Sequence, residues 1–590
     1  MTKREALNGK PYAGNPHVRF DEGEAASTAT SRRGSLLSLL KESAAMRWSL
    51  VSIVATICAA APIAAVADTL TWNGGASGNF STGPWTSDGS HTTPQNGDTI
   101  VFAAGGTFEN DISGLSVAGL SFSSADAVTL SGSQIAIANG GSVSQSGAGA
   151  VTVSAPLLLG SSSGETVYFA ASASTSLTLS GALSGAADVV YNNASTHSGT
   201  INLRNDGSDY TGATTARRGV VNVYSNDAFG STDGATTLSG AANNALKVYF
   251  NGVTMGEDFI VVANASNTPN NSPNYPVNFP ASNTFNGTWS VSGNGYFNNS
   301  SGTTTFNGRV VFSTIHFLGD GGLVFNGEGS TFANDVIYGN TITYGAKCKC
   351  TGEITVGRTF ATTWINMPHR RNFGCENAML YDETAPTALA FERVSCTADM
   401  CGFDQTFSYI SCASTYSSSV VTSAAPSTVH LTLGGSGAVT CYAKFTGQVS
   451  LSFEGPRPMS LGNTDSTSTG SLSLTNEAAV TLLDSFKWDG TLVSVADGST
   501  LTVGDVTFPE TLAVVINDRA ASGGNPAVSS KIVLNENMTT ETLTVNGQVM
   551  SGGKTYGAAG SGANVIDDDH FSGTGVLRVR KPCGFMLIVL

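Results

Sequence analysis

The sequence predicts an all-β protein built as a parallel β-solenoid, and three observations carry this prediction. The first is composition. Glycine accounts for 69 of the 590 residues, above the ~7% of an average protein. Charged residues make up only 12%, where about 25% is usual. Because glycine costs about 1 kcal/mol at a helical position, this composition disfavours helices, while an apolar share of 41% disfavours disorder.

The second observation is a strict alternation of polar and apolar residues in short segments. Residues 176–180 and 471–475 both alternate in this way, and Gly, Asn, Asp and Ser separate such segments. A period of two over four to six residues is typical of half-buried β-strands.

The third observation is a repeat of Phe-Asn-Gly at residues 285–287, 306–308 and 325–327, with spacings of 21 and 19 residues. About twenty residues is the length of one solenoid coil, and we expect coils of about 18–25 residues. Phe should then stack on Phe in the interior, with Asn-Gly at corners where glycine accepts positive φ. Asn-Gly also forms hairpin turns, so stacked antiparallel sheets are the alternative.

The N-terminal region has the pattern of an export signal. Met46-Arg47 precedes an apolar run over residues 48–61, and the small residues Ala65-Val66-Ala67 follow, a pattern that predicts cleavage between Ala67 and Asp68. Translation starts either at Met46 or at Met1 with an extended leader. The apolar run is short for a membrane span, so we expect the signal to engage the export machinery and the mature chain to lack a stable transmembrane span.

The charge distribution excludes two classes of partner. The formal net charge is −15, and no Lys or Arg occurs over residues 68–203. Nucleic-acid binding requires basic residues that displace phosphate counterions, and anionic lipid surfaces attract basic segments. We therefore expect no nucleic-acid partner, and expect surface glycans or other envelope components instead.

The cysteines cluster in one segment. Seven of the nine lie within residues 348–441, which we interpret as large loops or a small inserted module. An exported chain meets an oxidising compartment, so we expect at least two disulfides there. The candidates are Cys348, Cys350, Cys375, Cys396, Cys401, Cys412, Cys441 and the distant Cys583. Zinc bound by cysteines of this segment with His369 is the alternative, although the spacing is not that of a ribbon or finger.

No catalytic constellation is evident. Asn463-Thr464-Asp465 matches one short element of polygalacturonases, but the accompanying elements and further carboxylates are missing, so we interpret it as a turn. The acidic run Asp567-Asp568-Asp569-His570 lacks the interleaved glycine and ligand spacing of calcium loops and is interpreted as a solvated loop. We predict no catalytic, cofactor-binding or metal-ligating residue, and no cofactor.

Tryptophans are spread through the chain rather than clustered. We expect Trp72, Trp85, Trp289, Trp364 and Trp488 to have core or capping roles, with sugar stacking as the alternative. An open solenoid end exposes apolar surface and a strand edge. Trp72 and Trp85 should therefore pack in a cap over the first coil.

Three segments resemble bacterial autotransporter-associated β-strand repeat proteins, which are secreted and β-helical. The opening segment contains Trp72-Asn73-Gly74-Gly75 and Gly119-Leu120-Ser121-Phe122. A central coil contains Asp209-Tyr210-Thr211-Gly212 and Gly219-Val220-Val221-Asn222-Val223. The closing segment contains Gly553-Lys554-Thr555-Tyr556-Gly557. The chain departs from the pattern in having one clear repeat copy and no recognisable C-terminal barrel.

The resemblance implies a right-handed parallel β-helix and a location outside the cytoplasm. The expected organisation is a signal region (1–67), a capping module (68–125), a β-helix (126–345), a Cys-rich elaboration (346–445) and closing coils (446–590). The expected function is that of a non-enzymatic structural or adhesive protein, secreted or at the cell surface. The alternatives are a carbohydrate-binding protein and a β-helical enzyme that acts on polysaccharides.

Overall fold

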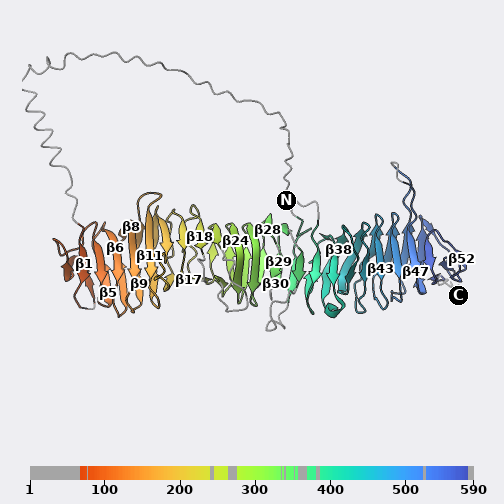
Figure 1. The fold of residues 1–590 in the computed structure, drawn as a ribbon, viewed down its shortest axis with the longest axis horizontal. Coiled ribbons are helices and arrows are strands. Elements are labelled where there is room, and N and C mark those ends of the chain that lie inside the picture. Colours follow the sequence, from red (N-terminus) through yellow and green to blue (C-terminus); the bar gives the residue numbers. More distant parts are fainter. Residues whose placement is uncertain are drawn as a thin grey trace, which may run out of the picture. The chain divides into compact units, whose positions relative to one another are not determined.

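The protein is a β-solenoid of about 16 turns in which parallel strands of successive coils stack on one another. The computed structural model describes residues 67–75, 77–239, 245–262, 276–333, 335–337, 341–350, 353–356, 369–380, 386–522 and 526–581. Figure 1 shows the coils following one another in chain order, from β1 to β52. Within these ranges there is no α-helix, only the short 3-10 turns η1 (Phe80–Thr82) and η3 (Ser414–Tyr416), and no helix long and apolar enough to cross a membrane.

One ladder of parallel strands runs through the whole stack. Its strands are β5 (Gly106–Asn110), β7 (Val128–Gly132), β9 (Val151–Val153), β12 (Ser176–Leu179), β15 (Thr200–Leu203), β17 (Gly219–Val223), β19 (Leu246–Phe250), β22 (Val277–Phe279), β24 (Trp289–Asn299), β26 (Val310–Leu318), β29 (Asp335–Ile337), β32 (Ile354–Val356), β34 (Leu389–Phe391), β37 (Ile410–Cys412), β39 (Val439–Cys441), β41 (Met459–Leu461), β43 (Ala479–Leu482), β45 (Thr500–Val503), β47 (Lys531–Leu534) and β53 (Phe571–Gly573).

Two further long ladders lie on other faces of the coils. The first belongs to the N-terminal part and contains β1 (Thr69–Trp72), β4 (Thr99–Phe102), β6 (Ser116–Phe122), β8 (Ile135–Gln145), β11 (Thr166–Ala171), β14 (Asp188–Tyr191), β16 (Thr214–Ala216), β18 (Thr236–Ser239), β21 (Phe259–Val262), β28 (Ser330–Phe332) and β31 (Cys348–Cys350). The second contains β20 (Thr254–Met255), β23 (Asn283–Phe285), β25 (Thr303–Phe306), β27 (Gly322–Phe325), β30 (Thr341–Tyr344), β33 (Arg370–Phe373), β35 (Thr397–Asp399), β38 (Val420–Leu431), β40 (Lys444–Glu454), β42 (Leu472–Thr475), β44 (Leu492–Ala496), β46 (Ala513–Asn517) and β49 (Thr542–Val545).

Some strands bend around a corner and join two faces. Strand β8 pairs with β10 (Leu157–Leu159) through its first residues and with β11 through its last. Gly140 lies at the bend with φ +73°, a backbone conformation that side chains with a Cβ rarely adopt. Such bends let one strand serve two faces of a coil.

The alternation predicted from the sequence separates the core from the surface. Inward side chains form a single hydrophobic cluster that extends from Leu70 to Val579. Phe285 stacks on Phe306 at 5.5 Å and Phe306 on Phe325 at 5.4 Å, which confirms the expected phenylalanine column. The strands that carry these rings pair in parallel, so stacked antiparallel sheets are wrong for this region.

The corner glycines of this repeat differ from the prediction. Gly287, Gly308 and Gly327 do not have positive φ. They are needed because a Cβ on Gly308 would lie 2.0 Å from the carbonyl oxygen of Gly287, and one on Gly327 would lie 2.1 Å from that of Gly308. Close approach of successive corners, rather than backbone conformation, therefore explains the glycines.

Antiparallel pairing occurs at the ends of the described stack. At the N-terminal end, β1 pairs antiparallel with β3 (Trp85–Ser87), which places Trp72 opposite Trp85. Their rings meet edge to face at 4.9 Å and pack on Phe80 and Phe108. Trp72 and Trp85 thus cover the first coil as expected.

The C-terminal end is closed differently. Strand β49 turns back into β50 (Gln548–Val549), and a small sheet of four strands lies beside it. Its strands are β48 (Met538–Thr540), β54 (Leu577–Val579), β51 (Thr555–Gly557) and β52 (Val565–Ile566).

Candidate functional site

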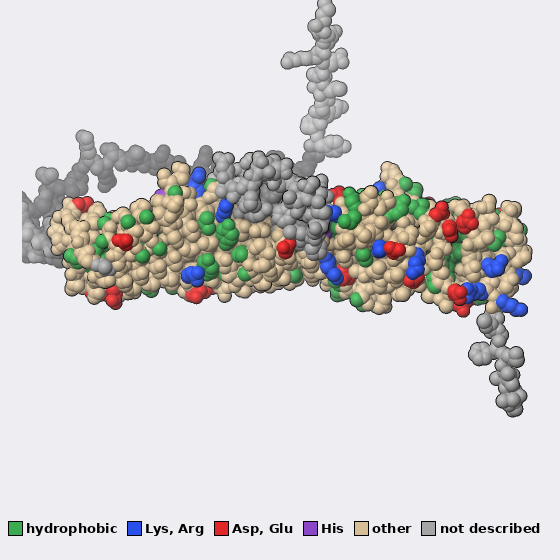
Figure 2. All heavy atoms as spheres, turned by 90° about the horizontal axis from the view of Figure 1, so that it is seen from below, with side chains coloured by type: hydrophobic (Ala, Val, Ile, Leu, Met, Phe, Trp, Pro, Cys, Tyr) green, Lys and Arg blue, Asp and Glu red, His purple; other side chains and the backbone are tan. Residues whose placement is uncertain are grey.

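The outer surface carries few charges. On the face shown in Figure 2, most of the visible surface consists of uncharged polar side chains and backbone, with scattered Lys, Arg, Asp and Glu. The alternation of the strands is the cause, because Ser, Thr and Asn occupy the outward positions, as in β12, β42 and β45. Hydroxyl and amide groups at outward positions offer hydrogen bonds rather than strong electrostatic attraction.

Asn463-Thr464-Asp465 forms a turn, as predicted. The side chain of Asn463 accepts a hydrogen bond from the backbone N–H of Asp465 at 2.8 Å and donates to the carbonyl of Tyr442. The Asp465 carboxylate pairs with Lys444 at 2.8 Å, and this hydrogen bond lowers the pKa of Asp465. The aspartate thus stabilises a turn and is not held in the protonated state that a general acid requires.

The acidic run at Asp567–His570 also forms a turn, but its histidine has a role that sequence reasoning missed. His570 Nδ1 lies 2.8 Å from an oxygen of Asp567, and Nε2 lies 3.0 Å from an oxygen of Asp518. Burial opposes protonation of His570, yet the hydrogen bonds and charges of the two carboxylates raise its pKa overall. We call His570, Asp567 and Asp518 the C-terminal clamp.

A second clamp lies at the other end of the solenoid. His91 Nδ1 lies 3.0 Å from Asp68 Oδ2, and His91 Nε2 lies 2.8 Å from Asp98 Oδ2. The hydrogen bond to Asp98 and the charges of both aspartates raise the pKa of His91. Burial disfavours ionisation of Asp68, but hydrogen bonds from Ser87 and from the backbone of Ser90 and His91 hold its pKa below the usual value. We call Asp68, His91 and Asp98 the N-terminal clamp.

Neither clamp has the geometry of a metal site. In each, the two ring nitrogens of the histidine point to different carboxylates, so the three groups do not converge on a common point. Across the ranges that the structure describes, no group of three or more His, Cys, Asp or Glu side chains could hold a metal ion.

The predicted disulfides are not formed. All seven described cysteines, Cys348, Cys350, Cys375, Cys396, Cys401, Cys412 and Cys441, are free thiols, and no two of them lie at disulfide distance. Cys583 lies outside the described residues. In the described part of this segment, β31, β37 and β39 are coil strands with inward cysteines.

Burial keeps the thiols of neighbouring coils unreactive. Cys412 and Cys441 occupy the same register position on adjacent strands, yet both are free and buried. Burial raises the pKa of Cys396 to about 11 and that of Cys412 to about 12, so these thiols remain protonated and unreactive. His369 is also buried, and its pKa falls to about 4 because of burial and the nearby Arg371 and Arg393.

Glu257 is a carboxyl group inside the solenoid. It is buried, and its Oε2 has no hydrogen-bond partner among the described residues. Burial is the main reason why its pKa rises to about 7, and the charge of Asp227 adds to it. A buried carboxyl group with an unsatisfied oxygen destabilises the fold when it is ionised.

The described tryptophans belong to the core. Trp72, Trp85, Trp289 and Trp488 are all buried, which confirms the core and capping prediction for these four, and Trp364 lies outside the described residues. A tryptophan platform for sugars is therefore wrong for these positions.

Aromatic side chains of another kind do reach the surface. Asn202, Asn222 and Tyr249 share one outward register position on β15, β17 and β19, and the amide of Asn222 donates to Asn202 at 2.8 Å. Beside this row, the guanidinium of Arg204 lies 3.9 Å above the ring of Tyr224. We call these five residues the amide–tyrosine row.

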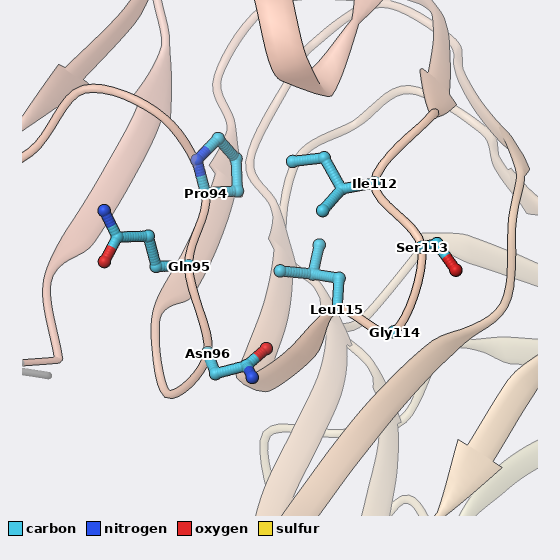
Figure 3. A pocket seen from close by; sticks show the side chains of 7 residues that line it. All are labelled: Pro94, Gln95, Asn96, Ile112, Ser113, Gly114 and Leu115. Atoms are coloured by element: carbon cyan, nitrogen blue, oxygen red, sulfur yellow. The ribbon is translucent and has the colours of Figure 1, made fainter. Parts of the chain in front are cut away.

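A depression of about 410 Å³ lies near the N-terminal end, and its lining residues are Pro94, Gln95, Asn96, Ile112, Ser113, Gly114 and Leu115. Figure 3 shows Ile112 and Leu115 facing Pro94, while Gln95 and Ser113 point away. Asn96 accepts a hydrogen bond from the backbone of Ser116. The depression thus lacks the converging polar groups that orient a ligand.

Comparison with known proteins gives no relative: no family model matches the chain, and no curated protein or solved structure matches it. The β-helical body implied by the resemblance to autotransporter-associated repeat proteins is present.

Proposed function

We propose that the protein is a non-enzymatic structural or adhesive protein that is exported to the cell surface or secreted, similar in kind to autotransporter passengers. The single observation that carries this proposal is the uniformity of the body. One hydrophobic core runs from Leu70 to Val579, and many outward strand positions carry hydroxyl side chains, as in β12, β42 and β45.

Physical reasoning connects this uniformity with the role. A solenoid grows by nearest-neighbour stacking and presents an extended surface whose length depends on the number of coils. Several of the described carboxylates are engaged in clamps, turns and surface ion pairs, as Asp98, Asp465 and Glu510 illustrate. Such a body suits repeated weak contacts or a spacer role better than a single reaction centre.

The proposal is tested by measuring where the full-length protein is located and whether it binds to surfaces. Val54→Asp interrupts the apolar run of the export signal and provides the matched control. We expect the wild-type protein outside the cytoplasm, accessible to protease on intact cells, and the variant inside. Protein-coated beads should bind to cell or matrix surfaces. Wild-type protein that stays in the cytoplasm would contradict the proposal. So would protein that cleaves polysaccharide while the beads coated with it bind no better than uncoated beads.

A second candidate is carbohydrate binding at the amide–tyrosine row. Amides donate and accept hydrogen bonds, and the half-buried ring of Tyr249 and the exposed ring of Tyr224 offer flat apolar surface with a polar edge, which together suit neutral sugars. Tyr249→Ala should abolish any glycan-array signal, whereas Tyr168→Ala, an outward tyrosine on β11 away from the row, should leave it intact. Equal loss in both variants would exclude the row as the binding surface.

A further inference from the structure

The N-terminal clamp holds the backbone nitrogen of the residue at the predicted cleavage site. The N–H of Asp68 donates to Asp98 Oδ1 at 3.0 Å, and this contact is buried. Ala67, directly before it, is exposed. The boundary between the exported chain and its signal therefore coincides with the point where the backbone enters the folded cap.

The surroundings of Asp68 are closely packed. Its carboxylate accepts hydrogen bonds from Ser87 Oγ at 3.0 Å and from the backbone of Ser90 at 2.6 Å. Gly89 has no room for a side chain, since a Cβ there would lie 1.9 Å from Asp68 Oδ1. The next residue is held as well, because Thr69 N donates to Asp88 at 2.6 Å. Asp68 is thus fixed by the loop that contains His91.

The N-terminal clamp contains fewer positive than negative charges. Asp68 and Asp98 are both buried, and His91 is the cation placed between them. Asp98 also accepts hydrogen bonds from the backbone N–H groups of Asp68 and Gln95, which are neutral donors. Buried carboxylates are stabilised when a cation pairs with each of them, so two carboxylates and one imidazolium leave a deficit of one positive charge.

We propose that removal of the export signal turns the Asp68 nitrogen into an α-ammonium group that pairs with Asp98 and locks the N-terminal cap. This inference rests on the proposed export. Hydrolysis by a signal-cleaving endopeptidase consumes one water. The Ala67 C–Asp68 N bond breaks, hydroxide joins the Ala67 carbonyl carbon, and hydrogen joins the Asp68 nitrogen. The new carboxylic acid then releases a proton, and the new amine binds one.

The α-ammonium group supplies the missing positive charge at the Asp68 nitrogen, which already donates a hydrogen bond to Asp98. With His91 protonated, the clamp then contains two anions and two cations. Because Asp68 directly precedes β1, the pair also fixes the first strand of the solenoid, which contains Trp72. Processing therefore completes the cap rather than merely trimming the chain.

The test uses two forms of the full chain that differ in the position of the new amine by one residue. In the first, residues 64–67 are replaced by the recognition sequence of an endopeptidase that cuts directly after it, which leaves Asp68 first. In the matched control, residues 63–66 are replaced and Ala67 is first. The endopeptidase is co-expressed in the cytoplasm, so that the chain is cut before it folds and export is not required.

Two readouts report on the lock. In the Asp68 form, amide hydrogens of β1 should exchange more slowly than in the Ala67 form. The α-amine should also react more slowly with an acylating reagent, by about tenfold for each unit by which the pair raises its pKa. Asp98→Asn should remove both differences. If that variant fails to fold, the comparison of the Asp68 form with the Ala67 form still tests the proposal. Equal exchange and equal acylation in the two forms would overturn the proposal.

N-terminal sequencing of protein from its native cells separates this proposal from that of export. A chain that begins at Asp68 supports the lock. Exported protein that begins elsewhere overturns the lock and leaves the proposed function standing. A chain that remains uncut in the cytoplasm overturns the proposed function and, with it, the lock.

Discussion

The two ends of the solenoid contain the same arrangement of side chains in different surroundings. Each places an imidazole between two carboxylates, and both histidine side chains are 13% exposed. In the N-terminal clamp the aspartates are 1% and 0% exposed, whereas in the C-terminal clamp they are 26% and 23% exposed. Water and salt screen exposed pairs, so identical contacts should contribute more at the N-terminal end.

The packing around the clamps differs in the same direction. The N-terminal clamp adjoins a cap of interlocking rings formed by Trp72, Trp85 and Phe80. The C-terminal end relies on a small sheet and on polar turns, such as the bond from Ala559 N to Asp568 at 2.7 Å. Among the described residues, a cluster of aromatic rings covers the first coil, whereas polar turns accompany the buried apolar side chains of the small C-terminal sheet.

The largest effect should come from Trp72→Ala. Removing a buried tryptophan typically costs about 3–5 kcal/mol, and in a solenoid this loss should stay near its coil. Amide hydrogen exchange should accelerate in β1 and β4 and remain unchanged in β53. Tyr556→Ala, at a buried position of the other end, should show the reverse pattern with a smaller loss. A uniform acceleration along the chain would show that the two ends are a single cooperative unit.

The buried carboxyl group of Glu257 provides a test of whether pH changes the stability of the protein only through the clamps at the two ends. Below about pH 4.5 the group is neutral in both the folded and unfolded states. Its folded pKa of about 7 exceeds the ordinary 4.5, so stability falls as the pH rises from 4.5 to 7. Glu257→Gln should therefore raise the free energy of unfolding at pH 8 by up to roughly 3 kcal/mol and change it little at pH 4.5.

Urea unfolding at both pH values measures this effect, and Glu541→Gln, at an exposed position, is the control. A similar gain in both variants would show that overall charge, rather than burial of Glu257, is responsible.

His91→Gln should lower the free energy of unfolding of the N-terminal end by about 1–3 kcal/mol at pH 6, because the substitution leaves Asp98 buried with one charged partner fewer. The raised pKa of His91 means that its contribution is complete below pH 6.5 and disappears as the pH rises through the folded pKa. The lowered pKa of Asp68 adds stability above pH 3.8 that is lost as the pH falls through its folded value. Exchange of β1 amides, corrected for intrinsic base catalysis, should therefore be slowest between these limits in wild type. If the exchange rate of the β1 amides in His91→Gln still rises above pH 6.5 as it does in wild type, His91 is not the cause of that rise.

The C-terminal clamp should show the smallest effect. His570→Gln should cost less than about 1 kcal/mol at pH 6, as exposed ion pairs usually do. In 1 M salt, where the Debye length is about 3 Å, the difference between wild type and variant should vanish for His570 and persist for His91. Exchange of β53 and β1 amides with and without salt measures both. Equal salt sensitivity at the two ends would remove the distinction drawn from burial.

The features that repeat with the coil were predictable from the sequence, and those made between coils by loops were not. Phe285, Phe306 and Phe325 recur at the coil length, and their stacking follows directly from that period. The partners of His91 lie 23 and 7 residues away, and those of His570 lie 3 and 52 residues away. These separations share no period, so the clamps gave no signal in the sequence.

The cysteines show how a sound chemical rule can mislead in a solenoid. An even number of thiols in an exported chain favours disulfides, but this rule assumes loops that are free to approach one another. Cys348 and Cys350 instead alternate with an outward Lys349 on one strand, and both are buried in the core of the solenoid. Inward cysteines here substitute for small hydrophobic residues.

The glycine column at Gly287, Gly308 and Gly327 has a consequence for how such a chain can change over evolutionary time. Each of these corners rests directly on the backbone of the one before it, so any side chain acquired there would wedge two coils apart. The coils themselves differ in length, since the Asn side chains at the preceding position join across 21 and then 19 residues. Duplication or loss of a whole coil is therefore easier to accommodate than a single substitution at the column, and lineages should diverge in length before they diverge at these glycines.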